Sequence, residues 1–141
     1  MIMELSRALE AARATNHSVL TTIRSNGLPQ LSNVTHLTDA DGIIRISTTA
    51  DRAKYINLTR RPWAALKVDG PNFWSYAVLE GAVELSKIAA APDDQTVEEL
   101  ITLYRNLAGE HPDWDDYRAA MVADRRAVIR LNPSRAYGLL R

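Results

Sequence analysis

The sequence predicts a mainly β protein, an antiparallel barrel with helical additions. Short runs rich in β-branched residues recur along the chain and are separated by turn residues. One pair of runs is joined directly by Asn26-Gly27, which is typical of a hairpin because both residues tolerate positive φ. Residues 92–125 interrupt the β pattern with helical periodicity. Because hairpin turns join the first strands, we expect a meander closed into a barrel and not a doubly wound parallel sheet.

The first half of the chain contains one helix, a run of strands and a second helix. We expect a short amphipathic helix built on Leu5, Ala8, Leu9 and Ala12, then strands over 18–24, 29–37 and 43–48, then a helix over 51–61 that Pro62 ends.

The second half begins and ends with strands and carries the helical insert between them. We expect strands over 63–69 and 73–86, separated by a turn at Gly70-Pro71-Asn72, with a bulge at Gly81 in the second strand. One helix should follow Pro92 and end at Gly109, and another should cover 113–124. Strands over 128–131 and 136–140, separated by a turn at Asn132-Pro133-Ser134, should close the chain. Residues 1–141 are expected to form one domain.

Composition excludes several classes of function. The 141 residues include no cysteine, which removes disulfides, thiolate metal sites and thiol catalysis. Seventeen basic and seventeen acidic residues give a formal net charge of zero, so no long-range field attracts nucleic acid or an anionic membrane. No run approaches the ~20 apolar residues of a membrane span, and no signal-like segment opens the chain. We therefore expect a cytoplasmic protein without nucleic-acid or membrane partners.

The usual catalytic motifs are missing. His17, His36 and His111 are scattered without metal-ligand spacing, and no glycine-rich phosphate loop or nucleophile elbow occurs. No metal site is expected and no catalytic residue can be named. His36, at the end of an expected strand, is the one histidine that merits attention.

An anion site is suggested where the third strand meets the second helix. The strand ends in the hydroxyl residues Ser47 and Thr48, and Arg52 and Lys54 follow in the first helical turn. Cations at a helix N-terminus oppose the helix dipole, and a bound anion would remove that conflict. The alternative is a helix with Asp51 as N-cap and its cations in solvent.

Polar residues occur on both faces of the strand over 29–37. Alternation places Gln30 and Ser32 on one face and Asn33 on the other, where amide and hydroxyl groups could bind the edge of a planar heterocycle. An exposed edge strand is the alternative. The aromatic residues Trp74 and Tyr76 could likewise wall a flat cofactor, or belong to a core or a dimer interface.

In order, these segments resemble the pyridoxamine-phosphate-oxidase-like split-barrel superfamily. The resemblance is strongest to its actinobacterial branch of coenzyme F-420 (deazaflavin)-dependent oxidoreductases, and the helical insert makes it specific. It runs through Gly27-Leu-Pro-Gln-Leu-Ser-Asn-Val34, Asp51-Arg-Ala-Lys54, Asn57-Leu-Thr-Arg-Arg-Pro62, Trp74-Ser-Tyr-Ala77, Ala91-Pro-Asp-Asp94, Leu103-Tyr-Arg-Asn-Leu-Ala-Gly-Glu-His111 and Trp114-Asp-Asp-Tyr-Arg118.

The resemblance implies a split β-barrel that forms a homodimer, with two cofactor sites at the dimer interface. By position, the resemblance assigns phosphate binding to Arg52, Ala53 and Lys54, with Ser47 and Thr48 nearby. It assigns contact with the ring system to Gln30, Ser32 and Asn33. It assigns to Trp74 and Tyr76 the aromatic walls that the second subunit contributes.

The implied function is hydride transfer from reduced coenzyme F-420 to a small conjugated acceptor, with the chemistry supplied by the cofactor. The carboxylates that this cofactor carries beyond its phosphate would need further cations, for which Arg24, Arg60 and Arg61 are candidates. An FMN-dependent oxidoreductase and a non-catalytic cofactor- or tetrapyrrole-binding protein are the alternatives. Residues 135–141 do not look like the substrate-binding end of the pyridoxamine phosphate oxidases, so oxidation of vitamin B6 is not expected.

Overall fold

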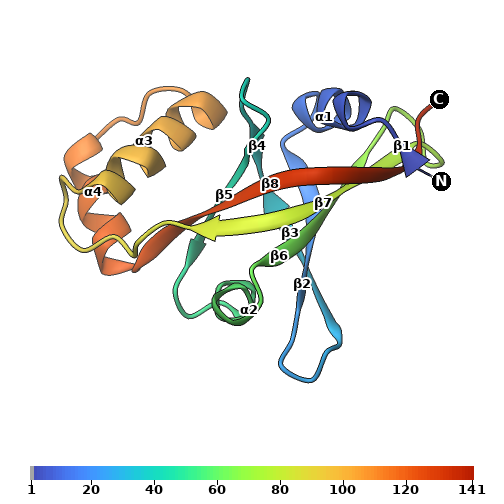
Figure 1. Cartoon of the computed structure of the whole chain (residues 1–141). Helices are drawn as coiled ribbons and strands as arrows, with labels where there is room; N and C mark the ends of the chain where they lie inside the picture. The colour runs from blue at the N-terminus through green and yellow to red at the C-terminus, as the bar shows by residue number, and fades with distance from the viewer. Residues whose placement is uncertain (1) are drawn as a thin grey trace.

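An antiparallel sheet curled into a half-barrel forms the body of the protein (Figure 1). The computed structural model describes residues 2–141. Within them, the sheet has eight strands in the order β3-β2-β6-β7-β8-β5-β4, and β1 pairs with β8 at its edge. The strands are β1 (Ile2–Met3), β2 (His17–Ile23), β3 (Pro29–Thr35), β4 (Leu37–Thr38), β5 (Ile44–Thr49), β6 (Trp63–Asp69), β7 (Tyr76–Leu85) and β8 (Arg126–Leu139). The expected antiparallel, mainly β fold is confirmed.

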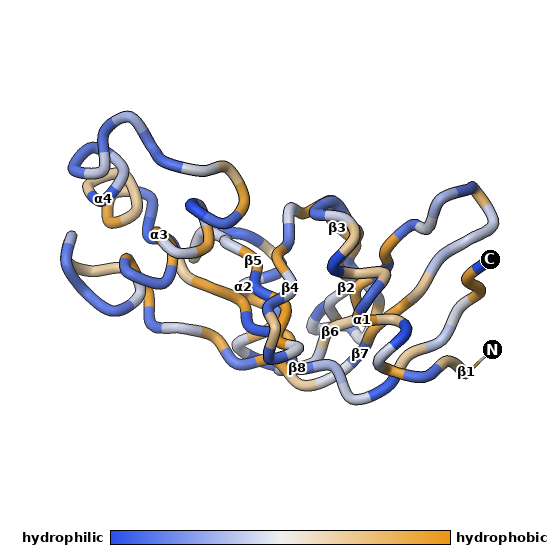
Figure 2. Tube along the Cα trace, turned by 90° about the horizontal axis from the view of Figure 1, so that it is seen from above, coloured by the Kyte–Doolittle hydropathy of each residue, from blue (hydrophilic) through white to orange (hydrophobic). Residues whose placement is uncertain are grey.

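Four helices accompany the sheet: α1 (Leu5–Arg13), α2 (Ala53–Arg60), α3 (Gln95–Ala108) and α4 (Trp114–Ala123). Two views agree that α3 and α4 lie together at one end of the molecule and the two termini at the other (Figures 1 and 2). Asp94 caps α3 by accepting a hydrogen bond from the Val97 amide. None of the helices within residues 2–141 has the length and apolar character needed to cross a bilayer.

Two apolar cores lie on opposite faces of β8. The larger core fills the concave side of the sheet, where α1 contributes Ala8 and α2 contributes Leu58. The smaller core lies under the helical insert. Neighbouring residues of β8 divide between them, since Ile129 belongs to the first core and Val128 to the second. The insert is therefore a packed layer of the structure and not a loose loop.

The end of the chain corrects the sequence-based prediction. Residues 126–139 form one strand, so the turn expected at Asn132-Pro133-Ser134 was wrong. Pro133 pairs with Gly81 and Arg135 pairs with Glu80, so Ser134 is the extra residue of a β-bulge next to the proline. A β-carbon on Gly81 would lie 2.2 Å from the Asn132 carbonyl oxygen, which explains the glycine. The bulge expected at Gly81 is thus confirmed, and it removes the need for a turn.

The start of β7 also differs from the prediction. The strand expected from residue 73 begins at Tyr76, because the turn before it is longer: the Gly70 amide donates to the Ser75 carbonyl across it. Phe73 and Trp74 therefore lie in the turn, 86% and 69% exposed. The hairpin expected at Asn26-Gly27 is present, with Gly27 at positive φ and β2 paired antiparallel with β3.

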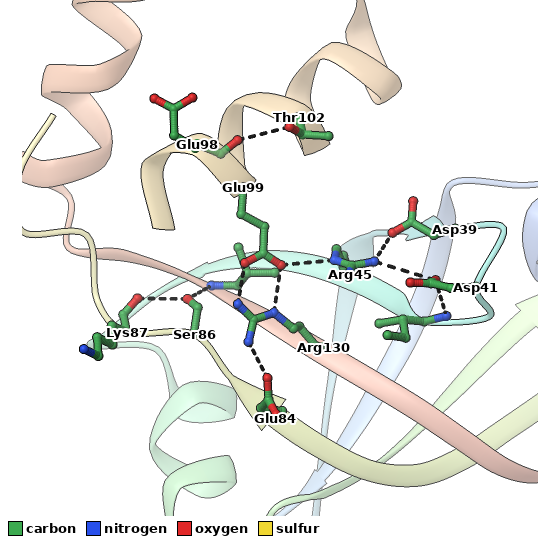
Figure 3. A network of polar contacts seen from close by, with 12 residues as sticks. Asp39, Asp41, Arg45, Glu84, Ser86, Lys87, Glu98, Glu99, Thr102 and Arg130 are labelled. Atoms are coloured by element: carbon green, nitrogen blue, oxygen red, sulfur yellow. Dashed lines mark hydrogen bonds and ion pairs between the residues drawn. The ribbon is translucent and has the colours of Figure 1, made fainter. Parts of the chain in front are cut away.

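A network of ion pairs fastens the insert to the sheet (Figure 3). Arg45 of β5 and Arg130 of β8 lie directly opposite each other, which would be unfavourable without a counter-ion. Glu99 of α3 lies between them, 3.0 Å from Arg45 Nε and 2.8 Å from Arg130 Nε. Burial alone would raise the pKa of Glu99, but the hydrogen bonds and charges of Arg130 and Arg45 outweigh it and lower the pKa. These cations are fully compensated.

His36 is a buried structural residue. Its Nε2–H donates to the Ala12 carbonyl at 2.9 Å, which leaves Nδ1 to accept from the Ser18 hydroxyl at 2.7 Å. The ring thereby joins α1 to β2, and neither nitrogen is free to ligate a haem iron. Burial lowers the pKa of His36 below 6.5, and His17 adds to the lowering, although the bond to Ala12 opposes it.

The buried neutral His36 predicts a pH-dependent stability. An unfolded His36 binds its proton near pH 6.5, whereas the folded one binds it only at lower pH. The free energy of unfolding should therefore decrease as the pH falls from 7 towards 5. Urea denaturation across that range should show the slope in the wild type and lose much of it in His36→Gln, with His111→Gln in the helical insert as control. An unchanged slope in His36→Gln would contradict this account.

Candidate cofactor site

A cleft of about 380 Å³ separates the helical insert from the sheet. We call it the insert cleft. Its polar side carries three groups from three elements: Ser47 of β5, Lys54 of α2 and Arg126 of β8. They meet because β5 pairs with β8, which places Arg126 opposite Thr49 at the end of the strand, just before the loop to α2. Arg126 Nη1 donates to the Ser47 hydroxyl at 3.3 Å.

The opposite wall of the insert cleft is apolar and aromatic. Its residues come from α3 and α4: Leu100, Leu103, Tyr104, Leu107, Tyr117 and Met121. Tyr104 and Tyr117 pack with ring centroids 5.1 Å apart, and the Tyr117 hydroxyl donates to the Leu100 carbonyl. A cleft with a cationic side and an apolar side suits a ligand that has an anionic group next to a carbon framework.

The cations of the insert cleft have no protein counter-ion. Among the ion pairs of residues 2–141, none includes Lys54, Arg52 or Arg126. Partial burial lowers the pKa of Lys54, and the positive charges of Arg52 and Arg126 lower it further. Arg126 Nε is buried without a hydrogen-bond partner in the described part of the chain. An anion in the cleft would pair these groups and relieve their repulsion.

The N-terminus of α2 is left open towards a neighbouring hollow. Arg52 occupies the N-cap position and makes no side-chain cap, so the alternative with Asp51 as N-cap was wrong. Asp51 instead accepts a hydrogen bond from the Thr49 hydroxyl. Arg52 lines a hollow of about 570 Å³ that also includes Arg126. We call it the arginine hollow.

Of the ring-binding candidates on β3, only one lines the insert cleft. Asn33 does so, whereas Gln30 lies in a polar chain in which Thr22 donates to Gln30 and Asn57 donates to Thr22. Ser32 points to the same side of the strand as Gln30, and its buried hydroxyl has no partner within residues 2–141. The alternation expected for this strand is present, and it separates Asn33 from the other two.

The remaining candidates around the phosphate divide in the same way. Ser47 faces the insert cleft, whereas Thr48, its neighbour on β5, is 2% exposed and lies on the core side of the strand. Ala53 is the first residue of α2, between Arg52 and Lys54.

Trp74 and Tyr76 lie far from the insert cleft. Tyr76 pairs with Leu139, and Asn72 in the same turn donates to the Arg141 carbonyl, which places this turn beside the C-terminus at the opposite end from α3 and α4 (Figure 1). Within one chain these aromatics and the cations do not form a common site.

A third surface depression, of about 390 Å³, runs along the outer face of β2, β3 and β6. We call it the sheet groove. It shares Asn33, Val34 and Thr35 with the insert cleft, so the two depressions adjoin along β3. Lys67 and Asp69, which form an ion pair, line the other side of the sheet groove.

Sequence reasoning missed Arg126 and the apolar wall. The periodicity of α3 and α4 identifies their buried face, but it does not show which of those residues border a cleft. Arg126 follows α4 without any local signal, because only the pairing of β5 with β8 brings it to Ser47. The additional cations proposed for a cofactor tail, Arg24, Arg60 and Arg61, line neither the insert cleft nor the arginine hollow. Arg24 is hydrogen-bonded to the Pro29 carbonyl and Arg60 to Asn57.

Solved structures with the same fold include proteins of different function. An F420 reductase is 26% identical, with a TM-score of 0.68 over 91% of this chain and 94% of its own. A pyridoxamine 5'-phosphate oxidase-related, FMN-binding protein from Nostoc punctiforme is 19% identical, with a TM-score of 0.60 over 94% and 79%. The heme storage protein HutZ from Vibrio cholerae is 12% identical, with a TM-score of 0.66 over 96% and 95%.

The sequence-level comparison covers nearly the whole chain. The family model described as pyridoxamine 5'-phosphate oxidase matches residues 5–140, from the start of α1 to the last residues after β8. This agrees with the resemblance found in the sequence, and with the curled antiparallel sheet. The chain belongs to the pyridoxamine 5'-phosphate oxidase family.

Proposed function

We propose that this protein is an oxidoreductase that binds the phosphate of a flavin-like cofactor in the insert cleft. The observation that carries the proposal is the group of uncompensated cations: Lys54 and Arg126 face one cleft, have no carboxylate partner in the described chain, and include a buried unpaired Nε–H. By contrast, Arg45 of β5 and Arg130 of β8 are neutralised by Glu99. The arginines that fasten the insert are thus compensated within the chain, whereas the cations of the insert cleft are available to a ligand.

Coenzyme F-420 is the cofactor that we propose, with FMN as the alternative. The F420 reductase described above is 26% identical to this chain, and the match covers nearly the full length of both proteins. When bound, a reduced deazaflavin supplies hydride, which a small conjugated acceptor would take up. Lys54, Arg126 and Ser47 would hold the phosphate, and the apolar wall of α3 and α4 would exclude water from the adjoining part of the cofactor.

We further propose that the active form is a homodimer. The outer face of the sheet exposes Leu31 on β3 and carries the sheet groove. Trp74 and Tyr76 lie at the far end of the same chain, so they can reach the cofactor only from a second copy. Exposed aromatic side chains such as Trp74, 69% exposed, are typical of surfaces that a partner covers. A ring lying in the sheet groove between two copies would connect directly to the insert cleft along β3.

The phosphate site predicts the effect of two substitutions. Lys54→Ala and Arg126→Ala should each weaken cofactor binding, because each removes a charge-assisted hydrogen bond of about 1.5–3 kcal/mol, or roughly ten- to a hundred-fold in affinity. The apo protein should be as stable as the wild type or more so, because each change removes a like charge from the cluster. Fluorescence titration with F-420 and with FMN, alongside thermal unfolding, measures both effects. The matched control is Arg61→Ala, because Arg61 is an exposed cation at the other end of α2. If the double variant of Lys54→Ala and Arg126→Ala bound the cofactor as tightly as wild type, the proposed phosphate site would be contradicted.

The enzyme and carrier functions predict different behaviour of the reduced cofactor. Reduced F-420 mixed with the protein should be reoxidised when a panel of conjugated acceptors is supplied, and should persist when the acceptor or the protein is left out. Absorbance of the oxidised deazaflavin follows the reaction. Binding without turnover across the panel would favour a carrier, and tight FMN binding with none for F-420 would favour the FMN alternative.

The dimer predicts that a charge on the outer face of the sheet affects both assembly and binding. Light scattering at micromolar concentration should give twice the mass of one chain. Leu31→Asp should shift the protein towards the monomer and weaken cofactor binding together, because it places a charge in an apolar contact, whereas Asn106→Asp on the exposed side of α3 should change neither. A monomeric wild type that still binds cofactor would overturn this proposal.

A further inference from the structure

Arg125 has a backbone conformation that is unusual for its residue type. Its φ is 52°, and it is the one residue other than glycine with positive φ in the described chain. It follows Asp124, the C-cap of α4, at the position where a helix commonly ends on glycine because a β-carbon is unfavourable there. The chain therefore carries an arginine at a site that glycine would occupy at lower cost.

The backbone of Arg125 ties two turns together. Its amide donates to the Val122 carbonyl at 3.1 Å and so closes α4. Its carbonyl accepts from the Ala50 amide at 3.0 Å, which joins the end of α4 to the loop between β5 and α2. Both bonds use main-chain atoms only. These two bonds explain the backbone conformation of this residue. They do not explain why it has a guanidinium group, because glycine could make the same two bonds.

Arg125 lines the arginine hollow. Arg52 and Arg126 line it as well, together with the acidic residues Asp51 and Asp124. Asp51 is hydrogen-bonded to Thr49, 2.5 Å away. None of the three arginines is within salt-bridge distance of a carboxylate anywhere in residues 2–141. The hollow thus has an excess positive charge and unpaired donors.

The arginine hollow adjoins the insert cleft through one side chain. Arg126 lines both. The two spaces differ in their other walls: the insert cleft is bounded by leucine and tyrosine side chains of the insert, whereas the hollow contains no large apolar side chain. A ligand whose phosphate is bound at Lys54 and Arg126 could extend into the hollow only with a polar, anionic portion.

We propose that the arginine hollow is a second anion subsite, which binds a carboxylate or phosphate group located beyond the first phosphate of the cofactor. Arg52 and Arg125 both line the hollow and not the insert cleft, and Arg125 is the sharper test because its substitution leaves the N-cap of α2 beside Lys54 unchanged. The inference rests on the proposed function, since it takes the first phosphate to be bound at Lys54 and Arg126. It predicts discrimination between FMN, which ends in one phosphate, and coenzyme F-420, which carries carboxylates beyond its phosphate.

The test compares two ligands on wild type and Arg125 variants. Arg125→Gly removes the guanidinium and suits the backbone, so it should fold with an unfolding temperature equal to or above that of wild type. It should weaken F-420 binding by about ten-fold, as expected for one charge-assisted contact, and leave FMN binding within two-fold. Arg125→Asn, which also tolerates positive φ, should behave like Arg125→Gly, and Arg125→Lys should retain most of the F-420 affinity. Arg61→Ala is the control for a general loss of positive charge.

Each other outcome has a distinct meaning. If Arg125→Gly leaves F-420 binding unchanged while Lys54→Ala weakens it, the second subsite is refuted and the phosphate site stands. If Arg125→Gly weakens FMN and F-420 equally, Arg125 belongs to the first phosphate site and the hollow is not a separate subsite. If wild type binds neither ligand, the proposed function itself fails, and this inference fails with it.

Discussion

The strand β8 is the element on which the rest of the structure depends. It pairs with β7 along one edge and with β5 and β1 along the other, and it separates the two apolar cores. A strand of 14 residues with a twist that suits both partners needs a local irregularity, and the bulge between Gly81 and Pro133 provides it. Because β8 begins at Arg126, the same strand also places a cation opposite the end of β5. The pairing of β8 with β5 thus both extends the half-barrel and positions a cation of the cleft.

Two pairs of basic residues near β5 and β8 have opposite electrostatic environments. Arg45 and Arg130 face each other across β5 and β8, and the carboxylate of Glu99 compensates them, which holds the insert in place (Figure 3). At the start of β8, Arg126 lines the insert cleft together with Lys54 of α2, and neither forms an ion pair with a carboxylate of the described chain. Partly buried cations that repel one another lower the stability of the unliganded protein, and a ligand that pairs with them restores it. The contrast separates structural charge from charge that is available for binding.

The insert and the barrel contribute different properties to the cleft. The barrel supplies the polar groups, Ser47, Lys54 and Arg126, on strand ends and on the first turn of a helix. The insert supplies an apolar wall whose aromatic members, Tyr104 and Tyr117, pack with His111 and Trp114 in one cluster. This aromatic packing fixes the shape of the wall, and a fixed wall reduces the ordering cost of binding.

Local chemistry in the sequence determined most of the elements and some of the site. Features that depend on residues close in the chain can be predicted from spacing and residue type. They are the glycine turn of the β2–β3 hairpin, the helical insert, the bulge glycine and the cations Arg52 and Lys54. Tertiary structure decided the remainder, because it depends on pairing between distant segments. Pro133 became a bulge residue only because Gly81 lies opposite it, His36 became structural only because Ser18 and Ala12 enclose it, and Arg126 reached Lys54 only because β5 pairs with β8. Such pairings are set by the closure of the whole sheet, and no local pattern records them.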